Sequence, residues 1–129
     1  AIAAARAWPL AAIHGVDIDR QSIVVARENA AANRVGARIR FTCGPGVSAP
    51  GVRDAAPFDL IVANILAEPL VVLAPEIRQV AEPGAALVLS GLLVREAPRV
   101  LAAYRAQGFA LDRHRRYDGW STLTLVKRG

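Results

Sequence analysis

The chain has 129 residues, of which 53% are hydrophobic, and a formal net charge of +5 at pH 7. This length allows a real hydrophobic core, so we expect residues 1–129 to form one domain, and no apolar run approaches the roughly 18 residues of a membrane-spanning helix. The lone cysteine, Cys43, excludes an intrachain disulfide and favours a reducing compartment, so we expect a cytoplasmic protein.

The positive charge comes almost entirely from arginine, since Lys127 is the only lysine. A basic surface attracts polyanions, so a nucleic acid or an acidic partner is one interpretation. The other is a coding bias that places arginine on solvated faces. The chain lacks methionine and starts inside an alanine-rich run, AIAAARAW, so we expect it to be part of a longer protein.

Strand-like and helix-like segments alternate along the chain, with no internal repeat. Short apolar or alternating runs predict the strands, which lie at residues 11–18, 38–43, 58–64, 86–91, 109–116 and 121–127. Helical patterns bounded by Asp, Pro or Gly predict the helices, which lie at residues 1–8, from 20 to about 36, from 69 toward 83, and 95–107. Residues 44–57 are rich in glycine and proline, which predicts a loop.

Three local features refine this pattern. Asp19 suits the N-cap of the helix that follows it. Pro75 removes one internal hydrogen bond from the helix that Pro69 opens, so we expect a kink or a split there. Asp118-Gly119 favours a tight hairpin turn, so the last two strands are expected to be antiparallel.

The order of elements predicts an α/β fold with a mainly parallel sheet and helices on both faces. In such sheets, ligands bind outside the carboxyl ends of the strands. The polar residues at those ends are Asp17, Asn64 and Ser90. We therefore expect the functional site at that edge.

The stretch GVDID, residues 15–19, places an acidic residue at a strand end. The Asp17 carboxylate can accept hydrogen bonds from two vicinal ribose hydroxyls, and Ile18 can pack against an adenine ring. The alternative is that Asp17 is a solvated loop residue and Asp19 a helix cap.

The stretch FDLIVANILAEPL, residues 58–70, ends a buried strand in an amide, Asn64. A side-chain amide has an acceptor oxygen but no charge, so it can hold an amine nucleophile without stabilising the unreactive ammonium as a carboxylate would. Alternatively, Asn64 satisfies local backbone groups at the strand end.

Together these stretches resemble the S-adenosylmethionine-dependent methyltransferases of the seven-stranded Rossmann-like class. The closest resemblance is to the PrmA-like ribosomal protein methyltransferases, which modify a protein of the large-subunit stalk base. The matching segments follow in order over almost the whole chain: GVDIDRQSIVVARENAAANRV, FDLIVANILAEPL, residues 83–93, AYRAQGF and GWSTLTLVKRG. NILAEPL is the most specific of them, whereas GVDID is shared with many methyltransferases.

The resemblance implies S-adenosyl-L-methionine as cofactor and assigns its contacts. Asp17 would hold the ribose, Ile18 would line the adenine pocket, and Cys43 and Gly44 would lie near the adenine. Asn64 would contact the cofactor and also hold the methyl-accepting amine, as in related enzymes of the Asn-Pro-Pro-aromatic type.

The residues after Asn64 imply the kind of acceptor. Ile65-Leu66 replaces the two prolines of the related motif and Ala67 replaces its aromatic residue, which favours an aliphatic amine, a lysine side chain or an amino terminus. The acceptor pocket is expected to include Ile65, Leu66, Ser90 and Trp120. Trp120 either walls this pocket or packs as a half-buried aromatic.

The expected partners are a ribosomal protein substrate and ribosomal RNA, and the chain carries a basic run from Arg113 to Arg116. No membrane contact is expected. No metal is expected either, because His14 and His114 lack companion ligands. Two alternatives remain open. One is a non-catalytic Rossmann-like binding subunit that works through its basic run, and the other is a methyltransferase of the same fold with another acceptor.

The resemblance also implies missing parts. The family's first strand, its glycine-rich cofactor loop and its separate amino-terminal domain have no counterpart in residues 1–129. The strand would lie between those ending at Asp17 and Asn64, so its absence leaves two unpaired edges. About ten unpaired backbone groups, at roughly 1–3 kcal/mol each, rival the about 5–15 kcal/mol stability of a domain. We therefore expect this chain alone not to fold stably.

Overall fold

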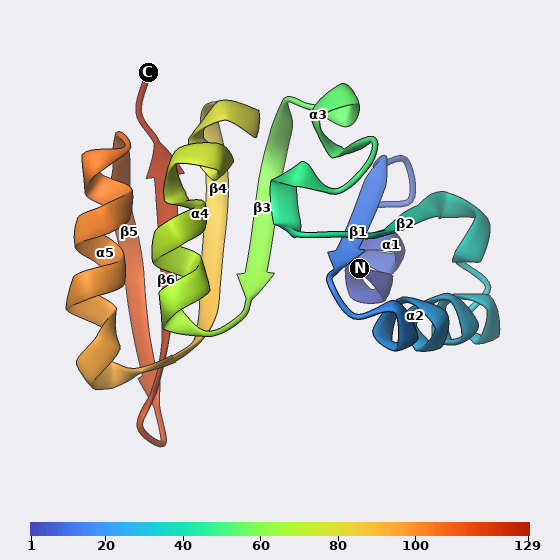
Figure 1. The fold of residues 1–129 in the computed structure, drawn as a ribbon, viewed down its shortest axis with the longest axis horizontal. Helices are drawn as coiled ribbons and strands as arrows, with labels where there is room; N and C mark the ends of the chain where they lie inside the picture. Colours follow the sequence, from blue (N-terminus) through green and yellow to red (C-terminus); the bar gives the residue numbers. More distant parts are fainter. The chain divides into compact units, whose positions relative to one another are not determined.

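The computed structural model describes all of residues 1–129, which form an α/β structure with two compact units, residues 1–54 and 55–129 (Figure 1). The first unit contains α1 (Ile2–Ala7), β1 (Ile13–Asp17), α2 (Arg20–Ala32), η1 (Gly36–Arg38), β2 (Ile39–Cys43) and η2 (Gly46–Ser48), and α3 (Val52–Ala55) spans the boundary. The second unit contains β3 (Phe58–Asn64), α4 (Ala67–Val80), β4 (Ala81–Leu93), η3 (Val94–Glu96), α5 (Ala97–Ala106), β5 (Phe109–Tyr117) and β6 (Trp120–Lys127).

In the first unit, β1 and β2 form a two-stranded parallel sheet, in register from Ile13 opposite Ile39 to Asp17 opposite Cys43. Its core joins α1, α2 and the two strands and consists of Ala5, Ala30, Val35 and Ile39, with Ile2, Ile13 and Phe41 packed against them. The parallel pairing brings the carboxyl ends of both strands to one edge. That edge carries the residues predicted to bind a nucleoside.

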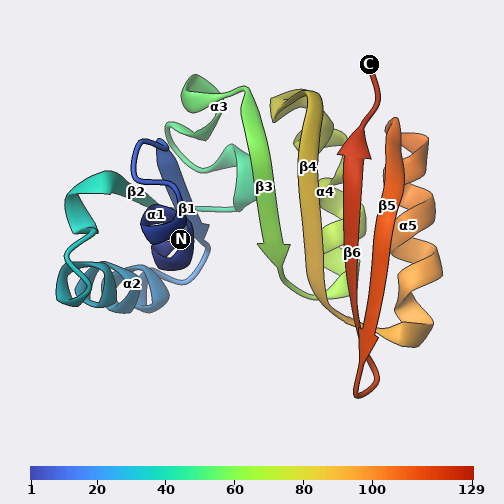
Figure 2. The same ribbon diagram turned by 180° about the vertical axis from the view of Figure 1, so that it is seen from behind.

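In the second unit, the strand order is β3-β4-β6-β5, with β3 and β4 parallel and the other pairs antiparallel (Figure 2). The hairpin turn between β5 and β6 has positive φ at both Asp118 (49°) and Gly119 (81°), as a type I′ turn requires. The predicted antiparallel hairpin at Asp118-Gly119 is confirmed.

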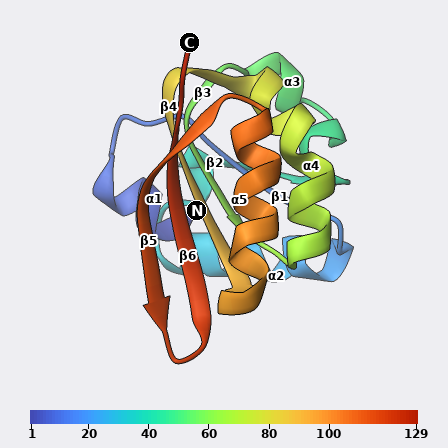
Figure 3. The ribbon, with the colours of Figure 1, turned by 90° about the vertical axis from the view of Figure 1, so that its left-hand side faces the viewer.

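Both helices of the second unit lie on the same face of its sheet (Figure 3). They cover four leucines with no exposed surface, namely Leu87, Leu89, Leu123 and Leu125. The expectation of helices on both faces concerned the sheet of the whole chain, and this unit places its helices on one face only. The reason is that β3-α4-β4 and β4-α5-β5 both connect parallel strands and both step in the same direction across the sheet, so right-handed connections place α4 and α5 on one side.

Some predicted boundaries differ from the observed ones. Helix α2 ends at Ala32 rather than near Gly36, because Arg34 takes a left-handed φ of 60° that no helix continues through. The predicted loop at residues 44–57 contains η2 and α3.

Both internal prolines lie inside regular elements. Helix α4 runs without a break through Pro75, so the expected alternative of a split is wrong, and the chain tolerates the lost hydrogen bond inside one continuous helix. The Pro83-Gly84 pair lies inside β4, where the register with β3 shifts and Gly84 has φ +83°. No helix of the structure combines the length and the apolar content needed to cross a membrane.

Candidate functional site

The first unit gathers the four predicted nucleoside-binding residues at the carboxyl ends of β1 and β2. Asp17 pairs with Cys43, and the Gly44 backbone N–H donates to the Asp17 carbonyl at 2.9 Å. The Cys43 thiol lies 3.5 Å from the Ile18 carbonyl oxygen, to which it donates. Asp17, Ile18, Cys43 and Gly44 are therefore neighbours.

The Asp17 carboxylate is oriented by its own turn. Its Oδ1 accepts from the Asp19 backbone N–H at 2.9 Å, and no hydrogen bond within the chain occupies Oδ2. Beside it, the Ile18 side chain is 75% exposed. An available carboxylate oxygen next to an exposed aliphatic surface suits a ribose hydroxyl and a planar base.

Gly44 shapes the loop that follows these strand ends. A Cβ at this position would lie 2.8 Å from both Cα and Cβ of Ala49, closer than real Cβ atoms approach. Only glycine therefore lets residues 45–50 fold back against the end of β2.

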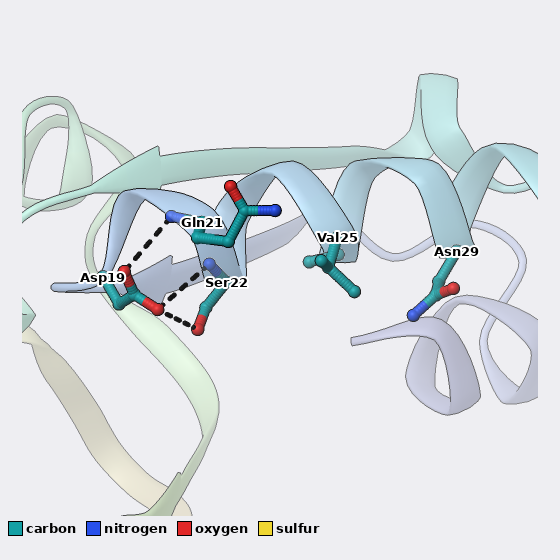
Figure 4. A pocket seen from close by; sticks show the side chains of 6 residues that line it. Asp19, Gln21, Ser22, Val25 and Asn29 are labelled. Atoms are coloured by element: carbon teal, nitrogen blue, oxygen red, sulfur yellow. Dashed lines mark hydrogen bonds between the residues drawn. The ribbon is translucent and has the colours of Figure 1, made fainter.

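A shallow pocket lies along α2 and is lined by Asp19, Gln21, Ser22, Val25, Ala26 and Asn29 (Figure 4). Its only carboxylate, Asp19, already accepts from the backbone N–H groups of Gln21 and Ser22 and from the Ser22 hydroxyl. These bonds, the Ser22 hydroxyl first, lower the pKa of Asp19 below its ordinary value. Asp19 therefore acts as the predicted helix cap. Asp17 is not among the residues that line this pocket.

In the second unit, Asn64 ends β3 directly opposite Ser90 of β4. The Asn64 side chain is exposed and makes no hydrogen bond within the chain. The alternative that Asn64 satisfies local backbone groups is therefore not what the structure shows. Ile65 and Leu66, which follow it, are 37% and 72% exposed, so an unpaired amide stands next to an apolar surface.

Sequence analysis missed one residue beside Asn64, namely Gly91. A Cβ at Gly91 would lie 2.7 Å from Asn64 Oδ1 and 2.8 Å from the Ile65 carbonyl oxygen. The signal available in the sequence was the glycine inside the strand pattern ALVLSGLL, since an isolated glycine in a strand marks a bulge or a close approach.

Trp120 starts β6, where it pairs with Leu93 of β4 and Tyr117 of β5. Because Ser90 pairs with Asn64 and Leu93 lies three residues further along β4, Trp120 is at the same end of the sheet as Asn64. Its side chain is 53% exposed, which leaves an aromatic surface open at this end.

Both histidines bond to hydroxyl groups on neighbouring strands. His14 Nε2 lies 2.7 Å from Thr42 Oγ1, and His114 Nε2 lies 2.8 Å from Ser121 Oγ. Burial, and secondarily Arg40 for the first and Arg116 for the second, lowers the pKa of each histidine below its ordinary value. These bonds join strands, and no three His, Cys, Asp or Glu side chains in the chain form a group that could hold a metal ion.

In sequence, this chain is similar to ribosomal protein L11 methyltransferases. The family model described as ribosomal protein L11 methyltransferase (PrmA) matches residues 1–128. The ribosomal protein L11 methyltransferase of Bradyrhizobium diazoefficiens is 49% identical over 129 residues, which cover 100% of this chain and 43% of that protein. That of Rhodopseudomonas palustris is 47% identical over 127 residues, or 98% of this chain and 43% of that protein.

Solved structures agree with this match. The ribosomal protein L11 methylase of Lactobacillus delbrueckii subsp. bulgaricus superposes with a TM-score of 0.90 at 29% identity, over 100% of this chain and 64% of that one. An RNA methyltransferase of Salinibacter ruber, solved with S-adenosyl-L-homocysteine, has a TM-score of 0.74 at 22% identity over 98% of this chain and 72% of that one, which shows the fold alone. The chain spans less than half the length of the curated relatives it matches. By the match over residues 1–128, it belongs to the ribosomal protein L11 methyltransferase (PrmA) family.

Proposed function

We propose that the protein containing this chain transfers a methyl group from S-adenosyl-L-methionine to an amine of ribosomal protein L11. The observation that carries the proposal is the exposed, unpaired amide of Asn64 at a strand end, in a chain whose relatives are named for this activity. The cofactor, when bound, supplies an activated sulfonium methyl group. The protein's task is then to bind and orient the acceptor amine and to favour its neutral form, which has released its proton to the solvent.

We assign cofactor binding in the first unit to Asp17, Ile18, Cys43 and Gly44. The Asp17 carboxylate accepts from the ribose hydroxyls, and a charged hydrogen bond of this kind contributes roughly 1.5–3 kcal/mol. Ile18 and the Cys43-Gly44 strand end cover the adenine.

Asn64 also holds the acceptor amine by accepting a hydrogen bond at Oδ1. Keeping a lysine amine neutral at pH 7 costs roughly 4.6 kcal/mol, because its ordinary pKa is about 10.4. The apolar surface of Ile65 and Leu66 lowers the amine's pKa by removing water, and an uncharged Asn64 does not raise it again. Ser90 and Trp120 complete the acceptor pocket.

The acceptor is a flexible aliphatic amine, either a lysine side chain or an amino terminus. The support is the residue pattern after Asn64, where Ile65, Leu66 and Ala67 stand and none of these three is an aromatic residue that could stack on a planar base or amide. The exposed fractions of Ile65 and Leu66 leave room for an alkyl chain to pack beside them.

Residues 1–129 act as one catalytic domain with a seven-stranded sheet. β1 pairs only with β2, and β3 pairs only with β4, so each of these strands has one edge to which a further strand can add. The glycine-rich cofactor loop would follow that strand. The protein works in the cytoplasm, where ribosomal proteins are made.

The protein also contacts ribosomal RNA near the stalk base through the β5–β6 hairpin. Arg113 and Arg115 pair with Thr124 and Thr122, on the same face as exposed Tyr117 and Trp120. Arginines beside exposed aromatic rings suit a phosphate backbone with unstacked bases. Arg113→Gln with Arg115→Gln would then weaken binding to an RNA of the L11 site and lower its salt dependence, while S-adenosylhomocysteine binding stays unchanged. If RNA binding by the double variant and by the wild type depended equally on salt concentration, the hairpin would not contact RNA.

The central test combines binding and turnover in the protein as the cell makes it. We expect S-adenosylhomocysteine to bind in a calorimetric titration and Asp17→Asn to weaken that binding. Methyl transfer to purified ribosomal protein L11 should fall with Asn64→Ala, while S-adenosylhomocysteine affinity drops less. If Asn64→Ala changed neither turnover nor acceptor affinity, the assignment of Asn64 would be wrong. Binding of RNA without methyl transfer would instead favour a non-catalytic binding subunit.

A further inference from the structure

We infer that Gly91 is a positioning residue for Asn64, a role that rests on the proposed function of Asn64. Gly91 lies in β4 with φ +83°, a conformation that side chains rarely adopt. A Cβ at this position would lie 2.7 Å from Asn64 Oδ1, the atom assigned to accept the amine's hydrogen bond. The absence of a side chain at Gly91 therefore lets the Asn64 oxygen lie where it does.

The backbone at Gly91 is a β-bulge. On β4, Leu89 pairs with Leu123 and Leu92 pairs with Ser121, so three steps along β4 match two along β6. Leu89 and Leu92 are both fully buried, which means that the extra residue keeps the two leucines on the core side. Bulges bend a strand and redirect side chains, and they are common beside active sites.

The contacts of Gly91 also include the chain that follows Asn64. The same added Cβ would lie 2.8 Å from the Ile65 carbonyl oxygen and 3.2 Å from the Ile65 nitrogen. An alanine would thus push on the Asn64 amide and on the Ile65 peptide together. No hydrogen bond within the chain holds the Asn64 amide, and the backbone at Gly91 lies directly beside its oxygen.

The structure contains a matched control for this effect, Gly84. It lies in the same strand, has the same φ of +83°, and an added Cβ there would meet no atom within 4 Å. Alanine at either glycine adopts the same unfavourable φ, but only alanine at Gly91 reaches Asn64. The difference between the two variants therefore isolates the contact from the backbone strain.

The experiment measures methyl transfer to purified ribosomal protein L11 and S-adenosylhomocysteine affinity for Gly91→Ala and Gly84→Ala, each with and without Asn64→Ala. A misplacement of about 1 Å near the chemistry can cost on the order of a hundredfold in rate, so we expect Gly91→Ala to lower kcat by about ten- to a hundredfold. We expect Gly84→Ala to keep kcat within about twofold. S-adenosylhomocysteine affinity should stay within about twofold in both.

The double variant gives the readout that a merely structural role would not change. If Gly91 acts through Asn64, then Gly91→Ala should lower kcat by less than about twofold once Asn64 is already alanine. An equal loss in both backgrounds, or equal rates for Gly91→Ala and Gly84→Ala, would overturn the inference. Full turnover in Asn64→Ala alone would instead overturn the proposed function, so the two failures differ.

A folding defect also decides the question. If Gly91→Ala does not fold while Gly84→Ala does, the Asn64→Ala/Gly91→Ala variant is compared by circular dichroism and chemical denaturation. Recovery of the folded state assigns the defect to the contact with the Asn64 amide, as inferred. Continued failure assigns it to the Ile65 backbone and overturns the role of Gly91 toward Asn64.

Discussion

Tyr104→Phe removes one hydroxyl from the contact between α4 and α5 and leaves the ring in place. Tyr104 has no exposed surface, its hydroxyl donates to the Leu70 carbonyl at 2.8 Å, and its ring meets Phe109 edge-on at a centroid distance of 5.8 Å. A neutral hydrogen bond contributes a net of about 0.5–1.5 kcal/mol. Because phenylalanine keeps the ring contact, we expect the free energy of unfolding at pH 7 to fall by about 1 kcal/mol.

The same hydroxyl predicts a dependence on alkaline pH. Burial raises the pKa of Tyr104 above its ordinary value. The unfolded chain therefore loses this proton from about pH 10 upward while the folded chain keeps it, so the wild-type stability falls as pH rises, by up to about 1.4 kcal/mol per pH unit. Phenylalanine has no hydroxyl that can ionise, so the stability of Tyr104→Phe does not change with pH in this way. We expect the 1 kcal/mol deficit of Tyr104→Phe to shrink above pH 10 and to vanish near about pH 11.

Urea denaturation at pH 7, 10 and 11 measures both effects, with Tyr117→Phe as the control. Tyr117 is the chain's only other tyrosine and is 85% exposed, so the same chemical change there should leave stability nearly unaltered. If Tyr104→Phe and Tyr117→Phe had equal stability at pH 7, or if their difference did not change with pH, the buried hydrogen bond would not stabilise the fold as reasoned.

Three further predictions concern the strand ends. Asn64→Asp should lower methyl transfer at pH 7 and move the rate profile to higher pH, because a carboxylate stabilises the ammonium form of the acceptor; a profile that keeps its midpoint would contradict this. Asp17→Asn should weaken S-adenosylhomocysteine binding by about ten- to a hundredfold, the equivalent of one charged hydrogen bond, with unfolding by urea unchanged. Asp19→Ala should destabilise α2, since it removes the N-cap. The pKa of Asp19 is lowered in the folded state, so the carboxylate stabilises the fold at pH values above the ordinary pKa of an aspartate, and this contribution is lost as pH falls through the folded pKa. The stability difference between Asp19→Ala and wild type should therefore disappear at acid pH. Equal helix content of Asp19→Ala and wild type by circular dichroism at pH 7 would show that the cap does not act.

The sequence predicted the elements whose causes are local. Asp19 caps α2 because its carboxylate reaches N–H groups two and three residues away, and the pair Asp118-Gly119 forms the hairpin turn because both residues accept positive φ. The positions of Asp17 and Asn64 followed from hydrophobic strands that end in polar residues. Each of these signals lies within a few residues of the feature it predicts.

What the sequence did not predict depends on partners far along the chain. Gly91 is a bulge because of its pairing with β6, thirty residues later, and it approaches Asn64, which lies on another strand. Both helices cover one face because of the strand order, which no single segment contains. Pro75 stays inside a continuous α4, which its own propensity opposes and the packed residues Leu70, Ala74 and Ile77 support.

The exposed amide of Asn64 depends on both local and distant features, because its position follows from its own strand and its surroundings include Gly91 of another strand. A side-chain oxygen that accepts a hydrogen bond from an incoming amine must not already be occupied by a donor within the protein. The Asn64 side chain has no hydrogen-bond partner within the chain. Its orientation must then come from shape rather than from bonding. Gly91 lies next to Asn64 Oδ1, and there a missing side chain, not a hydrogen bond, leaves the space that this oxygen occupies. A glycine in a strand, which weakens the sheet locally, is thus the feature expected beside a polar group that has to stay unpaired until its substrate arrives.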